Sequence, residues 1–174
     1  MQPRQRILET AFTLFHKQGY NSTGINQIIA DSNVAKASFY QHFKSKEDLC
    51  VEFLNKRHDY WFGKLTEFTS KNRTNKTKIL ASFDFLIYMN EVENFRGCSF
   101  LNLLSEIPAD NIKILKVIQN HKNDLREYFK NLIDESNLSD HIYLLFESAI
   151  IESQLFKDQW PVIKSKKIVN NLIN

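Results

Sequence analysis

The side chains best suited to a chemical task lie between Val34 and Leu49. This stretch is expected to form a short helix over residues 35–43, with Phe39 and Phe43 on one inner face at i, i+4 spacing. Polar and basic side chains occupy its other faces: Lys36, Ser38, Tyr40, Gln41 and His42. A glutamine amide can pair bidentately with adenine, and a cationic helix suits a polyanion. These residue types at this spacing predict that the helix contacts DNA.

The charge of the chain supports the same prediction. The net charge is only +3, but residues 1–46 contain six Lys or Arg against two acidic residues. The remaining residues contain 17 basic and 18 acidic side chains. A compact basic head on a nearly neutral body indicates that the head meets a polyanion.

Local signals predict how the helix is held. Apolar residues recur at helical spacing over residues 4–18, and Gly19 suits the end of that helix because glycine tolerates positive φ. Thr23 is a good N-cap for a second short helix, and Asn33 lies in the turn that follows it. Ser45–Asp48 resembles a capping box that starts a long helix. Two short helices joined by a tight turn form a helix-turn-helix, whose second helix enters the major groove.

Helical periodicity continues to the end of the sequence. Further helices are expected over residues 46–68, 74–90, 97–107, 109–135, 139–156 and 161–172, with a break at Asn137–Asp140. Gly (four) and Pro (three) are scarce, which favours helices over a β-sandwich. We expect an all-α fold of about nine helices, divided into a three-helix domain at 1–46 and a larger helical domain at 47–174.

The N-terminal segment resembles the DNA-binding domain of the TetR family of bacterial transcriptional regulators. Matching residues at fixed spacing are Gly19, Tyr20, Thr23, Ile25, Ile28, Val34, Lys36, Phe39, Tyr40, His42, Phe43, Lys46 and Leu49. The chain departs from the family pattern at Ala37 and Asn33, where glycine is usual. A second segment, Arg96–Glu106, resembles the Gly-Cys-x-x-x-Asn-x-x-x-Glu stretch of one branch of the family. The resemblance implies a helix-turn-helix domain followed by an effector-binding and dimerisation domain.

The resemblance also implies roles for single residues in binding a double-stranded DNA operator. Lys36 and Ser38 match positions that reach base edges or nearby phosphates, and Gln41 is placed to contact a base. Tyr40, His42 and Lys46 match phosphate-contacting positions. Thr23 would aim the N-terminus of the second helix at a phosphate. Arg4 and Arg6 are candidates for a basic N-terminal arm on the DNA.

The protein is expected to be a homodimer, because one helix-turn-helix binds weakly and a dimer contacts two half-sites about 34–36 Å apart. The family builds its dimer interface from the last two long helices. Small residues at i, i+4 allow a partner helix to approach closely. The interface residues expected on this basis are Phe146, Ala149, Ile150 and Ser153.

The expected effector is a small apolar or aromatic molecule of unknown identity, which releases a repressor from its operator. Surplus aromatic and aliphatic residues are candidates for its pocket: Trp61, Phe83, Tyr88, Cys98, Phe100, Leu103 and Leu104. Cys98 lies two residues after Arg96, in the expected first turn of a helix. A nearby guanidinium and a helix N-terminus both favour a reactive thiolate. Cys98 is therefore either a sensor of electrophiles or oxidants or an inert buried thiol. Cys50 is expected to be structural.

Other classes of function are disfavoured by what the sequence lacks. No apolar run or signal-peptide core is present, so the chain is expected to be cytoplasmic, without a membrane partner. No Cys/His spacing resembles a zinc site, and no cofactor or metal is expected. The five His are scattered, which argues against an enzyme that pairs Cys98 with a histidine. A helical interaction module without sequence-specific DNA binding remains the alternative.

Overall fold

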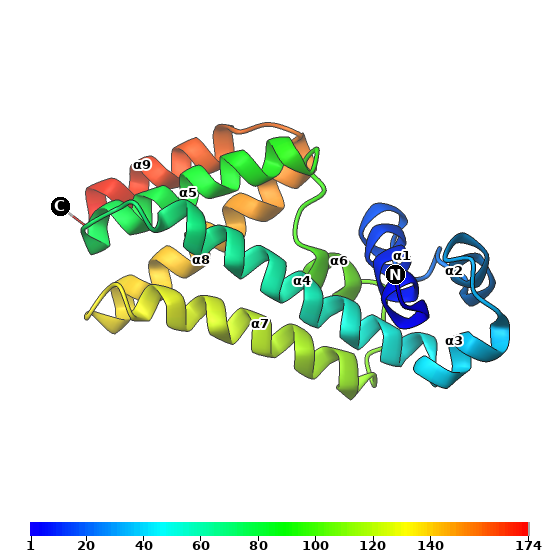
Figure 1. Ribbon diagram of the computed structural model, residues 1–174. Coiled ribbons are helices and arrows are strands. Elements are labelled where there is room, and N and C mark those ends of the chain that lie inside the picture. Colours follow the sequence, from blue (N-terminus) through cyan, green and yellow to red (C-terminus); the bar gives the residue numbers. More distant parts are fainter. Residues whose placement is uncertain (174) are drawn as a thin grey trace. The chain divides into compact units, whose positions relative to one another are not determined.

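The computed structural model describes residues 1–173, which form nine α-helices and no β-strand. The helices are α1 (Pro3–Gln18), α2 (Ile25–Asp31), α3 (Lys36–His42), α4 (Lys46–Thr69), α5 (Asn75–Val92), α6 (Ser99–Leu104), α7 (Ile112–Lys130), α8 (Ser136–Phe156) and α9 (Trp160–Leu172). The all-α expectation is confirmed (Figure 1). The chain groups into two compact units, and the division between them falls within α4 and α7.

The N-terminal unit consists of residues 1–60 and 99–120, and the C-terminal unit consists of residues 61–98 and the chain from 121 on. All of residues 1–46, the expected DNA-binding domain, belong to the N-terminal unit. The unit additionally contains the first part of α4, all of α6 and the first part of α7.

Burial of apolar side chains from four helices holds the N-terminal unit together. Ile7 and Ala11 of α1, Ile28 of α2, Phe39 of α3 and Leu49 of α4 are completely buried. α1 ends as expected at Gly19, whose φ of 94° is in the left-handed region and whose N–H donates to Phe15 O. These contacts place α2 and α3 against α1 in the helix-turn-helix arrangement.

Of the two turns in this unit, one agrees with the expectation from the sequence and the other does not. Asn33 adopts a φ of 51°, as expected for the turn between α2 and α3. Thr23, however, is not the N-cap of α2, because that position is occupied by Gly24 without a side-chain cap. Thr23 is completely buried, and its Oγ1 donates to Gly19 O at 2.7 Å. The hydroxyl therefore stabilises the α1–α2 turn instead of the start of α2.

The start of α4 agrees with the sequence-based expectation, whereas the boundaries of α7 and α8 differ from it. Ser45 Oγ accepts the Asp48 N–H at 3.0 Å at the start of α4, and Thr74 forms a capping box with Thr77 at the start of α5. The expected break at 137–140 is wrong, because α8 already begins at Ser136. α7 is also shorter than expected, beginning at Ile112 and ending at Lys130.

The C-terminal unit has a core rich in aromatic rings. α5, α8 and α9 lie side by side (Figure 1), and the rings of Phe83 and Phe129 each meet that of Phe146 edge-on, with centroids 5.3 and 5.2 Å apart. The unit therefore buries its largest side chains in preferred aromatic geometry.

The expected dimer-interface residues are part of this core. Phe146, Ala149 and Ser153 are at most 1% exposed, and Ile150 is 8% exposed. Their own chain buries them, so they are not available to a second subunit. The expectation failed because both faces of α8 carry apolar residues, and the face with small residues points inward.

Two glycines of the C-terminal unit make a matched test of this backbone. Gly97 has a φ of 76°, and a Cβ there would collide with the side chain of Gln154, whereas Gly63 lies exposed within α4 with no atom within 4 Å of an added Cβ. Gly97→Ala is expected to lower the free energy of unfolding by about 1–3 kcal/mol. Gly63→Ala should raise it by about 0.5–1 kcal/mol. Urea denaturation of the two variants measures these changes in free energy of unfolding. Equal effects would contradict the conclusion that the backbone requires glycine at position 97.

Candidate nucleic-acid interface

α3 presents a polar outer face because its apolar face is buried. Phe39 is completely buried and Phe43 is 3% exposed, with their ring centroids 6.1 Å apart. The expected contact residues lie on the remaining surface: Lys36, Tyr40, Gln41 and His42 are exposed, and Ser38 is half-buried. The structure thus brings together five of the predicted DNA-binding side chains on one seven-residue helix.

Lys46 joins this group from the start of α4. Its Nζ lies 4.1 Å from the centroid of the Tyr20 ring, in cation–π geometry. Partial burial lowers the pKa of Lys46, and burial, followed by electrostatic interactions with Cys50 and Glu47, raises the pKa of Tyr20 to about 12. Tyr20 therefore fixes the position of an ammonium group next to the recognition helix.

Thr23, by contrast, offers no side chain to DNA. Because its hydroxyl is buried and bonded to Gly19 O, it cannot contact a phosphate. The prediction of a phosphate-directed Thr23 cap is therefore wrong.

Arg4 and Arg6 do not form an extended arm, because α1 begins at Pro3 and both residues lie within it. Arg4 Nη2 pairs with Glu52 Oε2 at 2.9 Å, and its guanidinium lies 5.3 Å from the centroid of the Phe43 ring. Arg6 Nε is buried and has no hydrogen-bond partner among the described residues. Arg4 thus stabilises the packing of α1 on α4.

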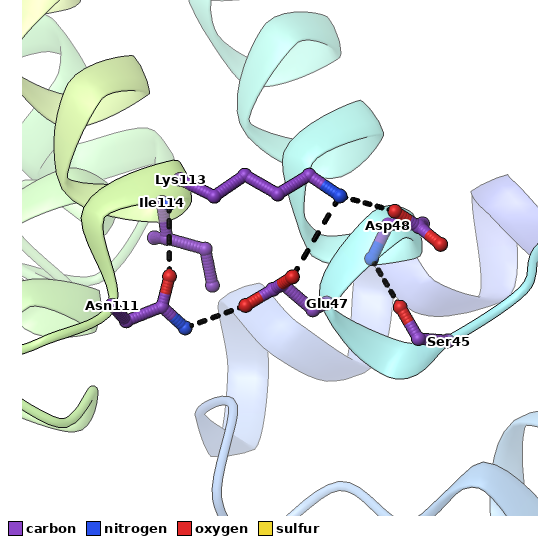
Figure 2. A network of polar contacts seen from close by, with 6 residues as sticks. All are labelled: Ser45, Glu47, Asp48, Asn111, Lys113 and Ile114. Carbon is purple, nitrogen blue, oxygen red and sulfur yellow. Dashed lines mark hydrogen bonds and ion pairs between the residues drawn. The ribbon is translucent and has the colours of Figure 1, made fainter.

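A polar network at the start of α4 was not predicted from the sequence (Figure 2). Lys113 Nζ donates to Asp48 Oδ1 and lies 3.7 Å from Glu47 Oε2. Asn111 Nδ2 donates to Glu47 Oε1 at 2.8 Å. The hydrogen bond with Lys113, followed by that with Ser45, lowers the pKa of Asp48. The partners are 64 and 65 residues apart in sequence, so no local signal could have revealed the network.

A surface cavity adjoins this network and the end of α3. It is lined by His42, Phe43, Lys44, Asp48, Val51, Glu52 and Lys113. Its lining includes two lysines, two carboxylates and His42, one of the predicted phosphate contacts.

Glu106, the last residue of the Gly-Cys-x-x-x-Asn-x-x-x-Glu segment, is bound to the α1–α2 turn. Its Oε2 accepts the Asn21 N–H at 2.7 Å, and its carbonyl oxygen accepts Asn21 Nδ2–H at 2.8 Å. A Cβ at Gly19 would lie 2.7 Å from Glu106 Oε1. The glycine therefore makes room for the carboxylate, and the carboxylate holds the turn that carries Tyr20.

Cys98 is half-buried in the C-terminal unit and precedes α6 instead of lying in its first turn. Lys122 Nζ is 3.4 Å from Cys98 Sγ and donates to both oxygens of Glu147, at 2.8 and 2.6 Å. Burial alone would lower the pKa of Lys122, but Cys98 and Glu147 raise it. Lys122 is therefore a cation held against the thiol. Cys50 is completely buried, and burial raises its pKa to about 12, as expected for a structural cysteine.

The other candidate pocket residues are not gathered in one unit. Phe100, Leu103 and Leu104 belong to the N-terminal unit, and Trp61, Phe83, Tyr88 and Cys98 belong to the C-terminal unit. Phe83, Phe100 and Leu103 are at most 3% exposed, and Phe83 packs in the hydrophobic core with its ring against that of Phe146. Trp61 is half-buried, with its ring edge-on to those of Phe85 and His121. Tyr88 lines a surface cavity with Lys64, Glu67, Phe68 and Lys71.

Among the described residues, no group of three or more His, Cys, Asp or Glu side chains is placed to hold a metal ion. No helix within residues 1–173 combines the length and apolarity needed to cross a bilayer.

Comparison with known proteins gives matches to transcriptional regulators. The sequence model described as "Bacterial regulatory proteins, tetR family" matches residues 7–53. An uncharacterized HTH-type transcriptional regulator of Bacillus subtilis, YuxN, is 37% identical over 71 residues, which are 41% of this chain and 24% of that protein. An HTH-type transcriptional regulator of Staphylococcus aureus is 27% identical over 145 residues, which are 83% of this chain and 68% of that protein. The chain thus spans about a quarter of the first relative and two thirds of the second.

Solved structures show the same fold over nearly the whole chain. The TetR-family regulator SCO4454 from Streptomyces coelicolor superposes with a TM-score of 0.84 at 22% identity, covering 97% of this chain and 90% of that one. The reduced form of NemR from E. coli gives a TM-score of 0.82 at 18% identity, covering 98% and 96%. Because the sequence identities are 22% and 18%, these superpositions show a shared fold and nothing beyond it.

Proposed function

Since this chain is a TetR-family transcriptional regulator with an N-terminal helix-turn-helix, we propose that α3 binds operator DNA in the major groove. The observation that carries the proposal is the polar outer face of α3, fixed by the buried rings of Phe39 and Phe43. Lys36, Ser38 and Gln41 are proposed to contact bases or nearby phosphates.

Phosphate contacts are proposed for Tyr40, His42 and Lys46. Tyr40 is 45% exposed, while its ring meets that of Phe39 edge-on at 5.2 Å, so its hydroxyl is held at the surface of α3. Lys46 is restrained by Tyr20. A restrained side chain loses less conformational entropy on binding, which suits groups that set the register of a protein on DNA.

We also propose that the protein is a homodimer that uses the outer faces of α8 and α9. Leu144, Ile151 and Leu155 recur at helical spacing on α8 and are 61%, 48% and 67% exposed. On α9, Trp160 and Ile163 are 53% and 56% exposed. An apolar surface of this kind on consecutive helices marks an interaction site, and a second copy supplies the matching surface and the second helix-turn-helix.

Repression is proposed to end when an effector stabilises a state with lower DNA affinity. The effector is a small apolar or aromatic molecule, or an electrophile or oxidant that reacts at Cys98. Differential binding to the two states supplies the free energy of the shift.

The contact between Lys122 and Cys98 supports the Cys98 route. The Lys122 ammonium lies 3.4 Å from Cys98 Sγ, the atom that would add to an electrophile. When the thiol adds to a quinone, the sulfur bonds to a ring carbon, the π electron pair of that ring C=C bond shifts through the conjugated system to the quinone oxygen, and this oxygen takes the thiol proton. The adduct would occupy the space beside Lys122 and separate it from Glu147, in a side-chain cluster where both partners are only 13% exposed. Loss of a largely buried ion pair is a large local change.

The interface on α3 predicts separate losses of affinity and specificity. Gln41→Ala should weaken binding to the operator by about tenfold while leaving binding to unrelated DNA unchanged. Lys46→Ala should weaken both, and lower the slope of log affinity against log salt by about one. Lys17→Ala, at an exposed lysine of α1, serves as the control. Fluorescence anisotropy with DNA flanking the gene, over a KCl series, measures all four proteins.

If the wild type binds no DNA, or binds operator and unrelated DNA equally, the proposal is rejected and the interaction-module alternative is favoured. A Lys46→Ala slope equal to that of Lys17→Ala would reject the phosphate role of Lys46.

The dimer proposal predicts that Ile163→Glu dissociates the protein. The wild type should have twice the monomer mass of 20.5 kDa at micromolar concentration, and the variant should have the monomer mass, because a carboxylate would be buried in an apolar interface. Ile112→Glu is the matched control, because Ile112 is 73% exposed on α7. Light scattering after gel filtration measures the masses. A monomeric wild type, or a dimeric Ile163→Glu variant, would contradict the proposed interface.

The Cys98 proposal predicts a single reactive thiol. A quinone should add once to the native protein and release it from DNA, and Cys98→Ser should neither gain mass nor be released. Cys50→Ser should behave as wild type, because the Cys50 thiol is buried and its pKa is about 12. Intact-mass spectrometry and anisotropy provide the two measurements. Release of Cys98→Ser at the wild-type quinone concentration would rule out the covalent route.

A further inference from the structure

The first turn of α4 carries two carboxylates, Glu47 and Asp48, directly after the proposed phosphate contact Lys46. Both carboxylates are bound by residues outside the helix-turn-helix segment. Lys113 donates to Asp48 and lies 3.7 Å from Glu47, and Asn111 donates to Glu47 at 2.8 Å (Figure 2). The negative charge at this helix start is thus held by a neighbouring segment of the same unit.

Lys113 is fixed in place by the start of its own helix. The Ile114 N–H donates to Asn111 Oδ1 at 3.0 Å, so the residue that caps α7 also contacts Glu47. A cation in the first turn of a helix interacts unfavourably with the helix dipole, and the first turn of α7 contains no acidic residue. The stability of α7 therefore does not explain a lysine at this position, whereas the two carboxylates of α4 do.

Two of these groups, Asp48 and Lys113, lie beside a residue proposed to contact a DNA phosphate. Asp48 and Lys113 line one surface cavity together with His42 and Lys44, which lie at and just beyond the end of α3. His42 is proposed above to contact a phosphate. Uncompensated carboxylates on the wall of this cavity would repel phosphates, and the repulsion would oppose binding most strongly at low salt.

We infer that Lys113 is a positioning residue for DNA binding, which neutralises and holds Glu47 and Asp48 so that operator phosphates can approach the start of α4. This inference rests on the proposed DNA-binding function. The role differs from a direct contact, because Lys113 acts through the two carboxylates. It also differs from a structural contact that holds α4 and α7 together. If Lys113 acts by neutralisation, removing the carboxylate charge should compensate for the loss of the lysine.

Charge neutralisation predicts a rescue that a structural tie does not. Lys113→Gln should weaken operator binding by about fivefold in 0.1 M KCl, with a smaller loss at high salt. Lys116→Gln, the matched control at an exposed lysine of the same helix, should change affinity by less than about twofold. Adding Asp48→Asn to Lys113→Gln should restore affinity to within about twofold of wild type.

Asp48→Asn alone provides an independent variant. If Lys113 acts by neutralising the carboxylate, this variant should bind DNA at least as tightly as the wild type. If the ion pair serves only to hold α4 and α7 together, the variant should bind more weakly. Anisotropy with the operator duplex measures affinity, and circular dichroism checks helix content. An unrescued double variant, a weakened Asp48→Asn, or equal affinities of Lys113→Gln and Lys116→Gln would overturn the inference while leaving the proposed function intact. A wild type that does not bind the operator would overturn both.

Discussion

The N-terminal unit depends on one constraint, which is that α3 is too short to be stable alone. A helix of seven residues has few internal hydrogen bonds and requires tertiary packing in water. Phe39 and Phe43 provide this packing, and α1 and α2 contribute further buried aliphatic side chains to the unit. The side chains left on the outside of α3 are the ones available to DNA. Affinity for DNA and stability of the unit are therefore divided between opposite faces of the same helix.

The surroundings of α3 are fixed by polar contacts from a distant part of the chain. Glu106 binds the α1–α2 turn through Asn21, and the turn carries Tyr20, whose ring restrains Lys46. Asn111 and Lys113 bind the carboxylates at the start of α4. Residues that contact no DNA in the proposed complex thus set the position and the charge of those that do.

The C-terminal unit divides its apolar residues in a similar way. α8 uses Phe146 and Ala149 for the core of its own chain and leaves Leu144, Ile151 and Leu155 at the surface. A helix that is apolar on two faces has a second apolar contact to make, which accounts for the proposed dimer. The Lys122–Glu147 pair and Cys98 form the largely buried polar cluster of this unit.

The sequence by itself determined the features that depend on neighbouring residues. Helical periodicity gave the all-α fold, Gly19 and Asn33 marked their turns, Ser45 marked a helix start, and the spacing of Phe39 and Phe43 identified the outer face of α3. Tertiary structure alone decided the role of Thr23, the inward face of α8 and the partners of Cys98, Glu106 and Lys113. The reason is physical. Backbone geometry and i, i+4 neighbours are properties of a local segment, whereas the partners of Glu106 and Lys113 lie 85 and 65 residues away. Similarly, an apolar stripe on each side of α8 left its orientation undetermined until α5 and α9 packed against one of them.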